Sequence, residues 1–379
     1  MRFIFCGKAL LLAGLLSLPT LARADDFTAK NDAAVARNPA GVRCELRFSD
    51  GKSRFQMGET IRVTLTFSSD SIKQYRLDTY LQGPNSWHKL GNFKASPGDD
   101  VANPLADLPT PSYSSIAGYV PKPTLLSTRP TEITVDLNQY LRFDRPGIYQ
   151  IYCDTSRVFD DTPSNREFGA RIFGGYGVTS NVVPLEILPA DLDWAHEQVE
   201  EQRKIWRAER LFRSSPRPNN DLSYLGTQEA ALAIIERLGV TTDTDEAIYR
   251  WNYALVGFRD RSWLIETMKR TIERPDYGVT TGFVNTLSLL TALEAKKLGA
   301  PVPQTALPSQ YFGNLGSPIE IELRKRQTAQ RRTLYELVGA ALPLKLGRAK
   351  QQTKTTLIQE EKFGFGLAAP TLKELKKLP

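Results

Sequence analysis

The chain has 379 residues and a formal net charge of +7 at pH 7, with 41% hydrophobic and 24% charged residues. This composition is that of a globular protein, and the length favours about two domains. The charge is uneven, because residues 317–379 contain thirteen Lys or Arg but only six Asp or Glu. A basic C-terminal region is therefore expected, in place of a uniformly basic protein.

The N-terminus carries the pattern of an export signal. Two basic residues precede an apolar run of about ten residues, which is shorter than the ~20 residues that span a membrane. The small-residue sequence Ala22-Arg23-Ala24 follows, as at a signal peptidase site. We predict that residues 1–24 are a signal peptide cleaved after Ala24 and that the product is periplasmic or extracellular, without a transmembrane segment. The alternative is a short buried helix.

Two cysteines, Cys44 and Cys153, remain after that cleavage. An even pair in an exported protein is expected to form a disulfide, here one that closes a long loop. The alternative is two separate buried thiols.

Short segments in which apolar and polar residues alternate occupy residues 42–189, after a polar stretch that we expect to be a flexible leader, residues 25–41. The expected strands lie at residues 42–48, 61–67, 75–81, 133–137, 149–153 and 182–188. Such short strands, separated by Gly, Pro and Asp, are typical of an antiparallel β-sandwich. Tyr149 follows a turn with Asp and Gly, as does the tyrosine corner of an immunoglobulin-like domain.

A long Pro-rich loop, residues 82–131, interrupts the alternation. Irregular connections of this length are uncommon in compact domains and often carry function. Its aromatic and histidine side chains are candidate partner-binding residues: Trp87, His88, Tyr113 and Tyr119. The alternative is a loop that only packs on the sandwich.

Helical periodicity replaces the alternation over residues 190–300. Asp191 and Thr227 are expected to cap helices, and Asp243 to open another. The helix starts recur at a spacing of about 35 residues, which favours two tandem helical hairpins over a plain bundle. The remaining residues, 301–379, are expected to hold a basic helix and a partly disordered tail. The cations of the basic helix are further candidate partner-binding residues: Arg324, Lys325, Arg326, Arg331 and Arg332.

The β-sandwich followed by helical hairpins resembles secreted bacterial proteins that join an immunoglobulin-like domain to HEAT-like helices. Residues 142–149 and 224–227 carry the resemblance, which covers residues 42–300. It implies a multidomain β + α fold, with an N-terminal immunoglobulin-like antiparallel β-sandwich followed by an all-α helical-hairpin, HEAT or solenoid-like domain. It also implies an interaction scaffold, and it brings no catalytic residues.

The motifs of common enzyme sites are missing from the sequence. His88 and His196 are the only histidines, too few for a multi-histidine metal site. Neither a G-x-S-x-G nucleophile elbow nor a phosphate-binding P-loop occurs. We therefore expect no catalytic residues, no metal, no cofactor and, for an exported protein, no nucleic-acid partner.

Three functions remain open. The first is a non-catalytic scaffold of the cell envelope that contacts a protein or polymer partner. The second is an electrostatic binder of anionic envelope polymers or lipid head groups through the basic C-terminal region, whose binding would depend strongly on salt. The third is a hydrolase with a carboxylate-based site, which would need two carboxylates in a deep cleft.

Overall fold

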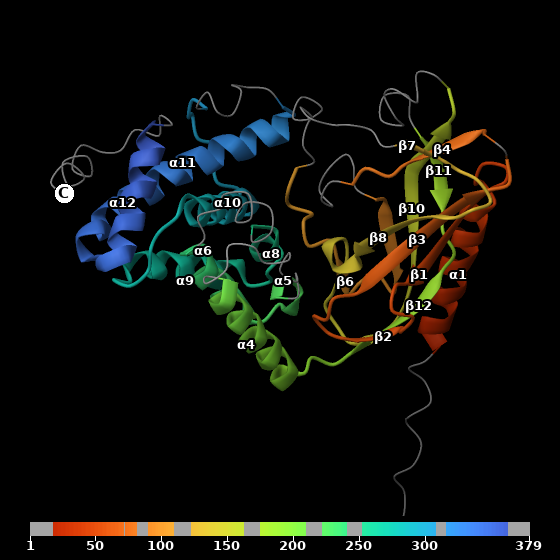
Figure 1. The fold of residues 1–379 in the computed structure, drawn as a ribbon, viewed down its shortest axis with the longest axis horizontal. Helices are drawn as coiled ribbons and strands as arrows, with labels where there is room; N and C mark the ends of the chain where they lie inside the picture. Colours follow the sequence, from red (N-terminus) through yellow and green to blue (C-terminus); the bar gives the residue numbers. More distant parts are fainter. Residues whose placement is uncertain are drawn as a thin grey trace, which may run out of the picture.

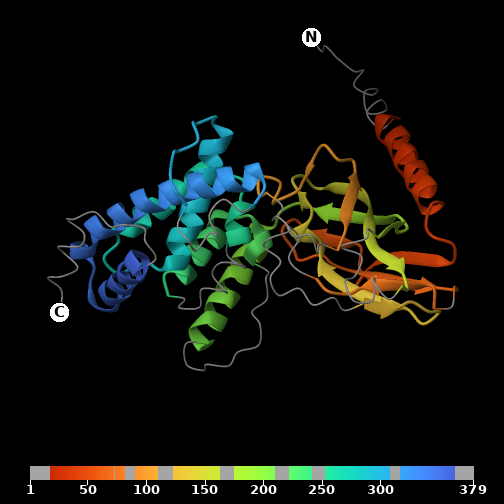
Figure 2. The same cartoon turned by 90° about the horizontal axis from the view of Figure 1, so that it is seen from above.

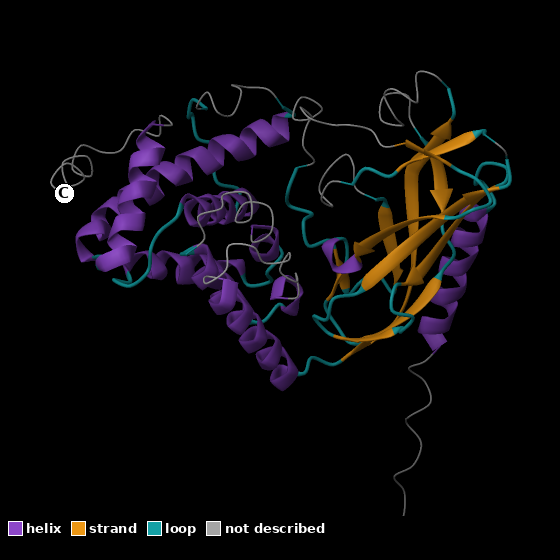
Figure 3. Ribbon diagram, viewed as in Figure 1, coloured by secondary structure: helices purple, strands orange, loops and turns teal. Residues whose placement is uncertain are grey.

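The computed structural model describes residues 18–71, 73–81, 90–109, 123–162, 175–209, 222–240, 252–307 and 316–362. Strands occupy the N-terminal part of the chain and helices the C-terminal part, in two groups that lie side by side (Figures 1 and 3). The expected order of a β region followed by a helical region is confirmed. Each region has its own buried core.

Two sheets enclose the core of the β region. The smaller sheet has the antiparallel order β1-β3-β8, and the larger has the order β2-β12-β10-β4-β7, with β5 and β11 also paired to β10. Strand β6 pairs with β9. The strands are β1 Val42–Phe48, β2 Arg54–Gln56, β3 Arg62–Ser69, β4 Tyr75–Asp78, β5 Asn92–Ser96, β6 Val101–Ala102, β7 Pro123–Leu125, β8 Thr131–Asp136, β9 Arg142–Phe143, β10 Gly147–Asp160, β11 Tyr176–Thr179 and β12 Val183–Leu188.

The alternation of residue types explains which faces of the strands are buried. Every second residue of β1 is buried, beginning with Val42, as the sequence predicts. Strand β3 lies between β1 and β8 and also buries Thr64 on its other face. The Thr64 hydroxyl lies 2.9 Å from the hydroxyls of both Ser49 and Thr134, which satisfies this buried polar group.

The tyrosine corner predicted at Tyr149 is present. The buried Tyr149 hydroxyl donates a 2.8 Å hydrogen bond to the carbonyl oxygen of Arg145. Its ring packs against Phe143, with ring centroids 4.9 Å apart. The turn before β10 is therefore fastened to the strand that follows it.

A helix, α1 Leu18–Val35, lies against the larger sheet where a flexible leader was expected (Figures 1 and 2). The Asn31 side chain donates a 2.8 Å hydrogen bond to the carbonyl oxygen of Ser180, and the Phe27 ring lies 5.0 Å from that of Tyr152. The leader prediction for residues 25–41 is wrong because these side chains find partners on the sheet. The helix also runs through Ala24, the predicted cleavage position.

The helical region is built around α10, whose residues are buried on several sides. The predicted cap at Thr227 is confirmed, since its side chain accepts a hydrogen bond from the backbone of Ala230; the predicted start at Asp243 lies outside the described residues. In the described ranges, no helix has the length and apolar character needed to cross a membrane. The helices are α4 Leu192–Glu209, α5 Leu222–Leu225, α6 Gln228–Leu238, α8 Asn252–Val256, α9 Arg261–Glu273, α10 Thr281–Lys297, α11 Pro318–Ala341, η5 Leu342–Leu344 and α12 Gly347–Lys362.

Helix α12 occupies residues 347–362, so this part of the region for which a partly disordered tail was predicted is ordered. Leu357 is fully buried in the helical core, and the buried Thr356 hydroxyl donates a hydrogen bond to the carbonyl oxygen of Val279. These contacts fix residues 347–362, and residues 363–379 lie outside the described part of the chain.

Candidate functional site

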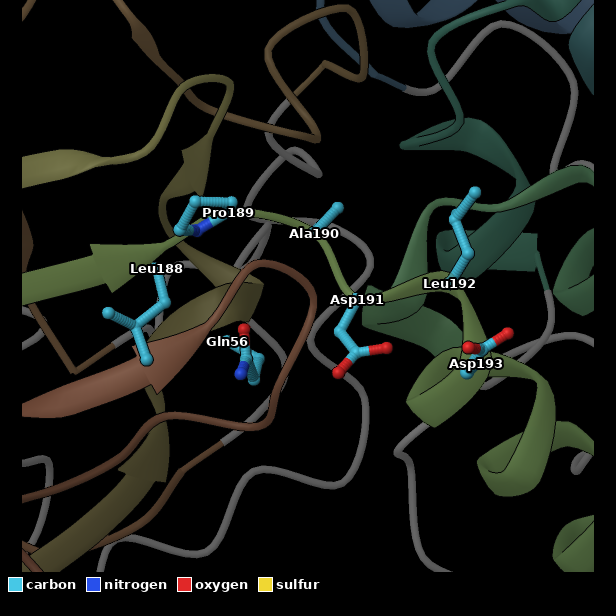
Figure 4. A pocket seen from close by; sticks show the side chains of 7 residues that line it. All are labelled: Gln56, Leu188, Pro189, Ala190, Asp191, Leu192 and Asp193. Carbon is cyan, nitrogen blue, oxygen red and sulfur yellow. The ribbon is translucent and has the colours of Figure 1, made fainter.

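The two regions are joined by a short linker beside an open hollow (Figure 4). The hollow has a volume of about 490 Å³ and combines residues of β2, the end of β12, the linker and the start of α4: Gln56, Leu188, Pro189, Ala190, Asp191, Leu192 and Asp193. Both regions and the connection between them contribute to this concave surface. We therefore take it as the candidate site.

The start of α4 shapes this hollow. The predicted cap at Asp191 is confirmed, because its carboxylate accepts a 3.0 Å hydrogen bond from the backbone of Trp194. Leu192, the first residue of α4, is 72% exposed, because it lies at the rim of the hollow and the buried face of the helix begins at Ala195. The hollow thus offers an apolar side chain beside the carboxylates of Asp191 and Asp193.

An ion-pair cluster fastens the β region to the helical region. Arg142 donates a 2.6 Å hydrogen bond to the carbonyl oxygen of Gly257, and Arg259 lies 2.5 Å from the carboxylate of Asp144. Arg142 also bonds Asp144, at 2.8 Å. Partial burial opposes ionisation of Asp144, but the hydrogen bonds and charges of the two arginines outweigh it, so the pKa of this carboxyl lies below its usual value. The carboxyl group of Asp144 is thus ionised at neutral pH and can pair with both arginines.

A segment of the β region also enters the helical core. Leu105, from the connection after β6, is buried among residues of the helices. Two residues later, Asp107 forms a 2.7 Å ion pair with Arg261, at the first position of α9. This connection belongs to the loop that the sequence suggests as a partner contact, and its described part instead holds the two regions together.

The backbones of the β region and the helical region also contact each other directly. Gly58 has a φ of 90° and lies against the backbone of Leu225 in α5, where a Cβ would overlap the main chain. Beside it, the Tyr224 hydroxyl lies 3.4 Å from the carboxylate of Asp136. No single pattern in the sequence identifies this boundary, although the paired charges in the short segments around Asp144 and Arg259 are a signal that could be searched for.

The predicted basic surface of α11 is largely internal. Arg326 is buried and bonds Glu322 one turn earlier at 2.8 Å, and Arg331 is buried and bonds Glu360 of α12 at 2.7 Å. Arg324 pairs with Glu320, Lys325 is half-buried, and Arg332 is exposed. The prediction of five exposed cations is wrong because the chain supplies its own carboxylates to three of them.

The two cysteines are thiols, and no disulfide joins them. Cys44 lies on β1 of the smaller sheet and Cys153 on β10 of the larger, both buried in the core between the sheets. The sulfur of Cys153 packs against Gly91, which precedes β5. The predicted disulfide is therefore corrected to the alternative of two buried thiols, and burial raises the pKa of Cys44.

Five residues singled out by the sequence remain: the four candidates of the Pro-rich loop and His196. Trp87, His88, Tyr113 and Tyr119 fall outside the described residues. His196 lies on the exposed side of α4, where it bonds the carboxylate of Glu229 at 2.9 Å. In the ranges that the structure describes, no group of three or more His, Cys, Asp or Glu side chains is arranged to hold a metal ion.

No protein-family model matches the chain, and no curated protein is similar to it.

Proposed function

We propose that the chain is an exported, non-catalytic binding protein of the cell envelope, in which an immunoglobulin-like sandwich and a HEAT-like helical array act as one body. The sandwich assignment is supported by two sheets around a common core and by the tyrosine corner at Tyr149. The helical-array assignment is supported by Thr280, before α10, whose hydroxyl bonds the carbonyl oxygen of Leu238 at the end of α6.

The observation that carries the proposal is the clamp between the regions. Arg142 and Arg259 hold Asp144 and Gly257 together, and Leu105 enters the helical core. A partner that contacts both regions then meets a preformed surface, and little conformational entropy is lost when it binds.

The linker hollow is the proposed contact surface for a protein or polymer partner. Gln56 and Leu188 line it from the β region, and Leu192 and Asp193 line it from α4 (Figure 4). An exposed leucine beside carboxylates suits a partner that presents an apolar group next to hydrogen-bond donors or cations.

The two alternative functions receive less support. Electrostatic binding through α11 would use arginines that bond carboxylates of their own region. A carboxylate hydrolase would use Asp191 and Asp193, but these line an open hollow, and Asp191 already caps α4.

Co-sedimentation of the processed protein with isolated cell-envelope fractions tests the proposal. We expect binding that persists at high salt and that Leu192→Ser weakens about ten-fold, because the substitution removes the exposed apolar side chain of the hollow. Leu298→Ser, at another exposed leucine, is the matched control and should bind as the wild type does. Failure to sediment, or equal losses in both variants, would overturn the proposal.

A further inference from the structure

The turn between α11 and α12 reverses the usual distribution of polar and apolar side chains. Lys345 is 1% exposed, whereas Leu344 and Leu346 on either side of it are 57% and 66% exposed. Lysine is among the residues least often fully buried, and leucine among those most often buried. Such a reversal costs stability unless specific contacts maintain it.

Hydrogen bonds to the end of α9 maintain the reversal. The Lys345 ammonium group donates a 2.6 Å bond to the carbonyl oxygen of Arg274, the residue that follows α9. The backbone of Leu346 donates a 3.0 Å bond to the carbonyl oxygen of Pro275. Because Lys345 has an extended backbone conformation, its two neighbours point to the opposite side, toward solvent.

Cations follow the two leucines directly. Arg348 is exposed and Lys350 is half-buried, and the first turn of α12 contains no acidic residue. Cations at the start of a helix oppose the helix dipole, so this placement does not serve the stability of α12. Across the turn, Glu273 is exposed, and the carboxylate of Asp276 is already paired with Arg274 at 2.9 Å.

We propose that residues 344–350, here called the leucine turn, dock on an anionic lipid bilayer. Leu344 and Leu346 would enter the boundary between head groups and acyl chains, and Arg348 and Lys350 would lie among the lipid phosphates. The end of α11 and helix α12 lie at the end of the molecule farthest from the sheets (Figure 1), which leaves the β region and the linker hollow directed away from the membrane.

Charge complementarity and the small size of the apolar contact favour a lipid bilayer over a protein as the partner of the leucine turn. Two leucines bury too little surface for a stable protein interface, which needs ~800 Å² on each partner. They suffice for shallow, reversible attachment when lipid charge adds to their burial. This attachment does not depend on the partner proposed for the linker hollow.

Vesicle co-sedimentation of the full chain tests the proposal. Wild-type protein is compared on phosphatidylglycerol and phosphatidylcholine vesicles with Leu344→Ser/Leu346→Ser and with Arg348→Gln/Lys350→Gln. The matched control is Leu298→Ser/Val302→Ser, which removes two exposed apolar side chains elsewhere in the helical region. All these substitutions are at solvent-facing or half-buried positions, and circular dichroism verifies that each variant folds.

We expect each leucine-turn double variant to reduce the partition coefficient on phosphatidylglycerol about ten-fold, with the control unchanged. Wild-type binding to phosphatidylcholine should be weaker by a similar factor. Equal wild-type binding to both lipids, or equal binding by the wild type and the double-serine variant, would overturn the proposal. An equal loss in the control would do the same. Because the vesicles contain no protein or polymer, a negative result leaves the proposed envelope partner untouched.

Discussion

Arg331 of α11 and Glu360 of α12 form an ion pair over 2.7 Å inside the helical region, with both side chains almost completely buried. The hydroxyl of Tyr335, one turn along α11, lies 3.4 Å from the same guanidinium group. Burying two charges costs more than their attraction returns unless the geometry and further hydrogen bonds compensate. The pair therefore fixes the position of α12 on α11 more than it raises overall stability.

Replacing one partner of this pair should be far more damaging than replacing both. Glu360→Leu removes the carboxylate that pairs with the buried Arg331. It should lower the free energy of unfolding by about 3–5 kcal/mol. Arg331→Met/Glu360→Leu should recover most of that loss, because no charge remains buried. Urea unfolding measures both, with Arg332→Met as the exposed control. If the double variant were as unstable as Glu360→Leu, the loss of stability would not come from an unpaired buried charge, and this account of the ion pair would be wrong.

A substitution in the β region should destabilise the helices. Leu105→Ala removes a buried side chain from the helical core and should cost about 2–5 kcal/mol. Hydrogen exchange should show lost protection in α9, whose first residue pairs with nearby Asp107. Ala106→Ser, at an exposed neighbouring position, is the control. Lost protection confined to the sheets would contradict the placement of Leu105.

The stability of the protein should rise with pH through the titration of Lys345. Burial lowers the pKa of Lys345 to about 8 from 10.5, although nearby Asp276 acts in the opposite direction. Between these two values the unfolded chain binds more protons than the native protein, so the free energy of unfolding increases with pH. Below pH 8 both states are protonated, and the cost of burying the ammonium group is fully present.

Urea unfolding of the wild type and of Lys345→Met from pH 7 to about 9.5 isolates this contribution. The wild type should gain stability relative to the variant as the pH rises. Burial raises the pKa of Cys44, Tyr277 and Tyr335, which lowers stability above the ordinary pKa of about 9 for cysteine and about 10 for tyrosine, but the wild type and the variant share these effects. Wild-type stability that stays constant or falls relative to the variant over this range would show that Lys345 is not buried as described.

Both cysteines should resist alkylation until the protein unfolds. Cys44 and Cys153 are buried, and burial raises the pKa of Cys44, so little thiolate is present at neutral pH. In denaturant without reductant, mass spectrometry should detect two alkylations. Absence of alkylation under these conditions would reinstate the disulfide predicted from the sequence.

The local parts of the fold follow from the sequence because they depend on neighbouring residues. The alternation in β1, the caps at Asp191 and Thr227 and the corner at Tyr149 each rest on a few adjacent positions. The extent of α1 did not follow in this way. The partners of Asn31 and Phe27 lie far along the chain, on the larger sheet, and the polar, alanine-rich stretch shows no sign of them.

The candidate site was harder to predict for the same reason. Arg331 resembles any surface cation until Glu360, 29 residues later in the chain, is placed beside it. Leu105 lies in a Pro-rich connection without periodicity, so nothing marks it as a core residue of the helices. The linker hollow arises only when β2, β12 and α4 meet, although its helical side begins at the predicted cap, Asp191.

The central claim is that the two regions form one body, and the distance between spin labels tests it most directly. Ile148→Cys on β10 and Leu298→Cys after α10 provide exposed attachment sites, while Cys44 and Cys153 are buried. Double electron–electron resonance should give one narrow distribution of distances between the two labels. Arg259→Ala should broaden this distribution. Arg145→Ala should not, because Arg145 pairs with Asp100 inside the β region. A broad distribution in the protein that carries only the labelling substitutions would contradict the claim.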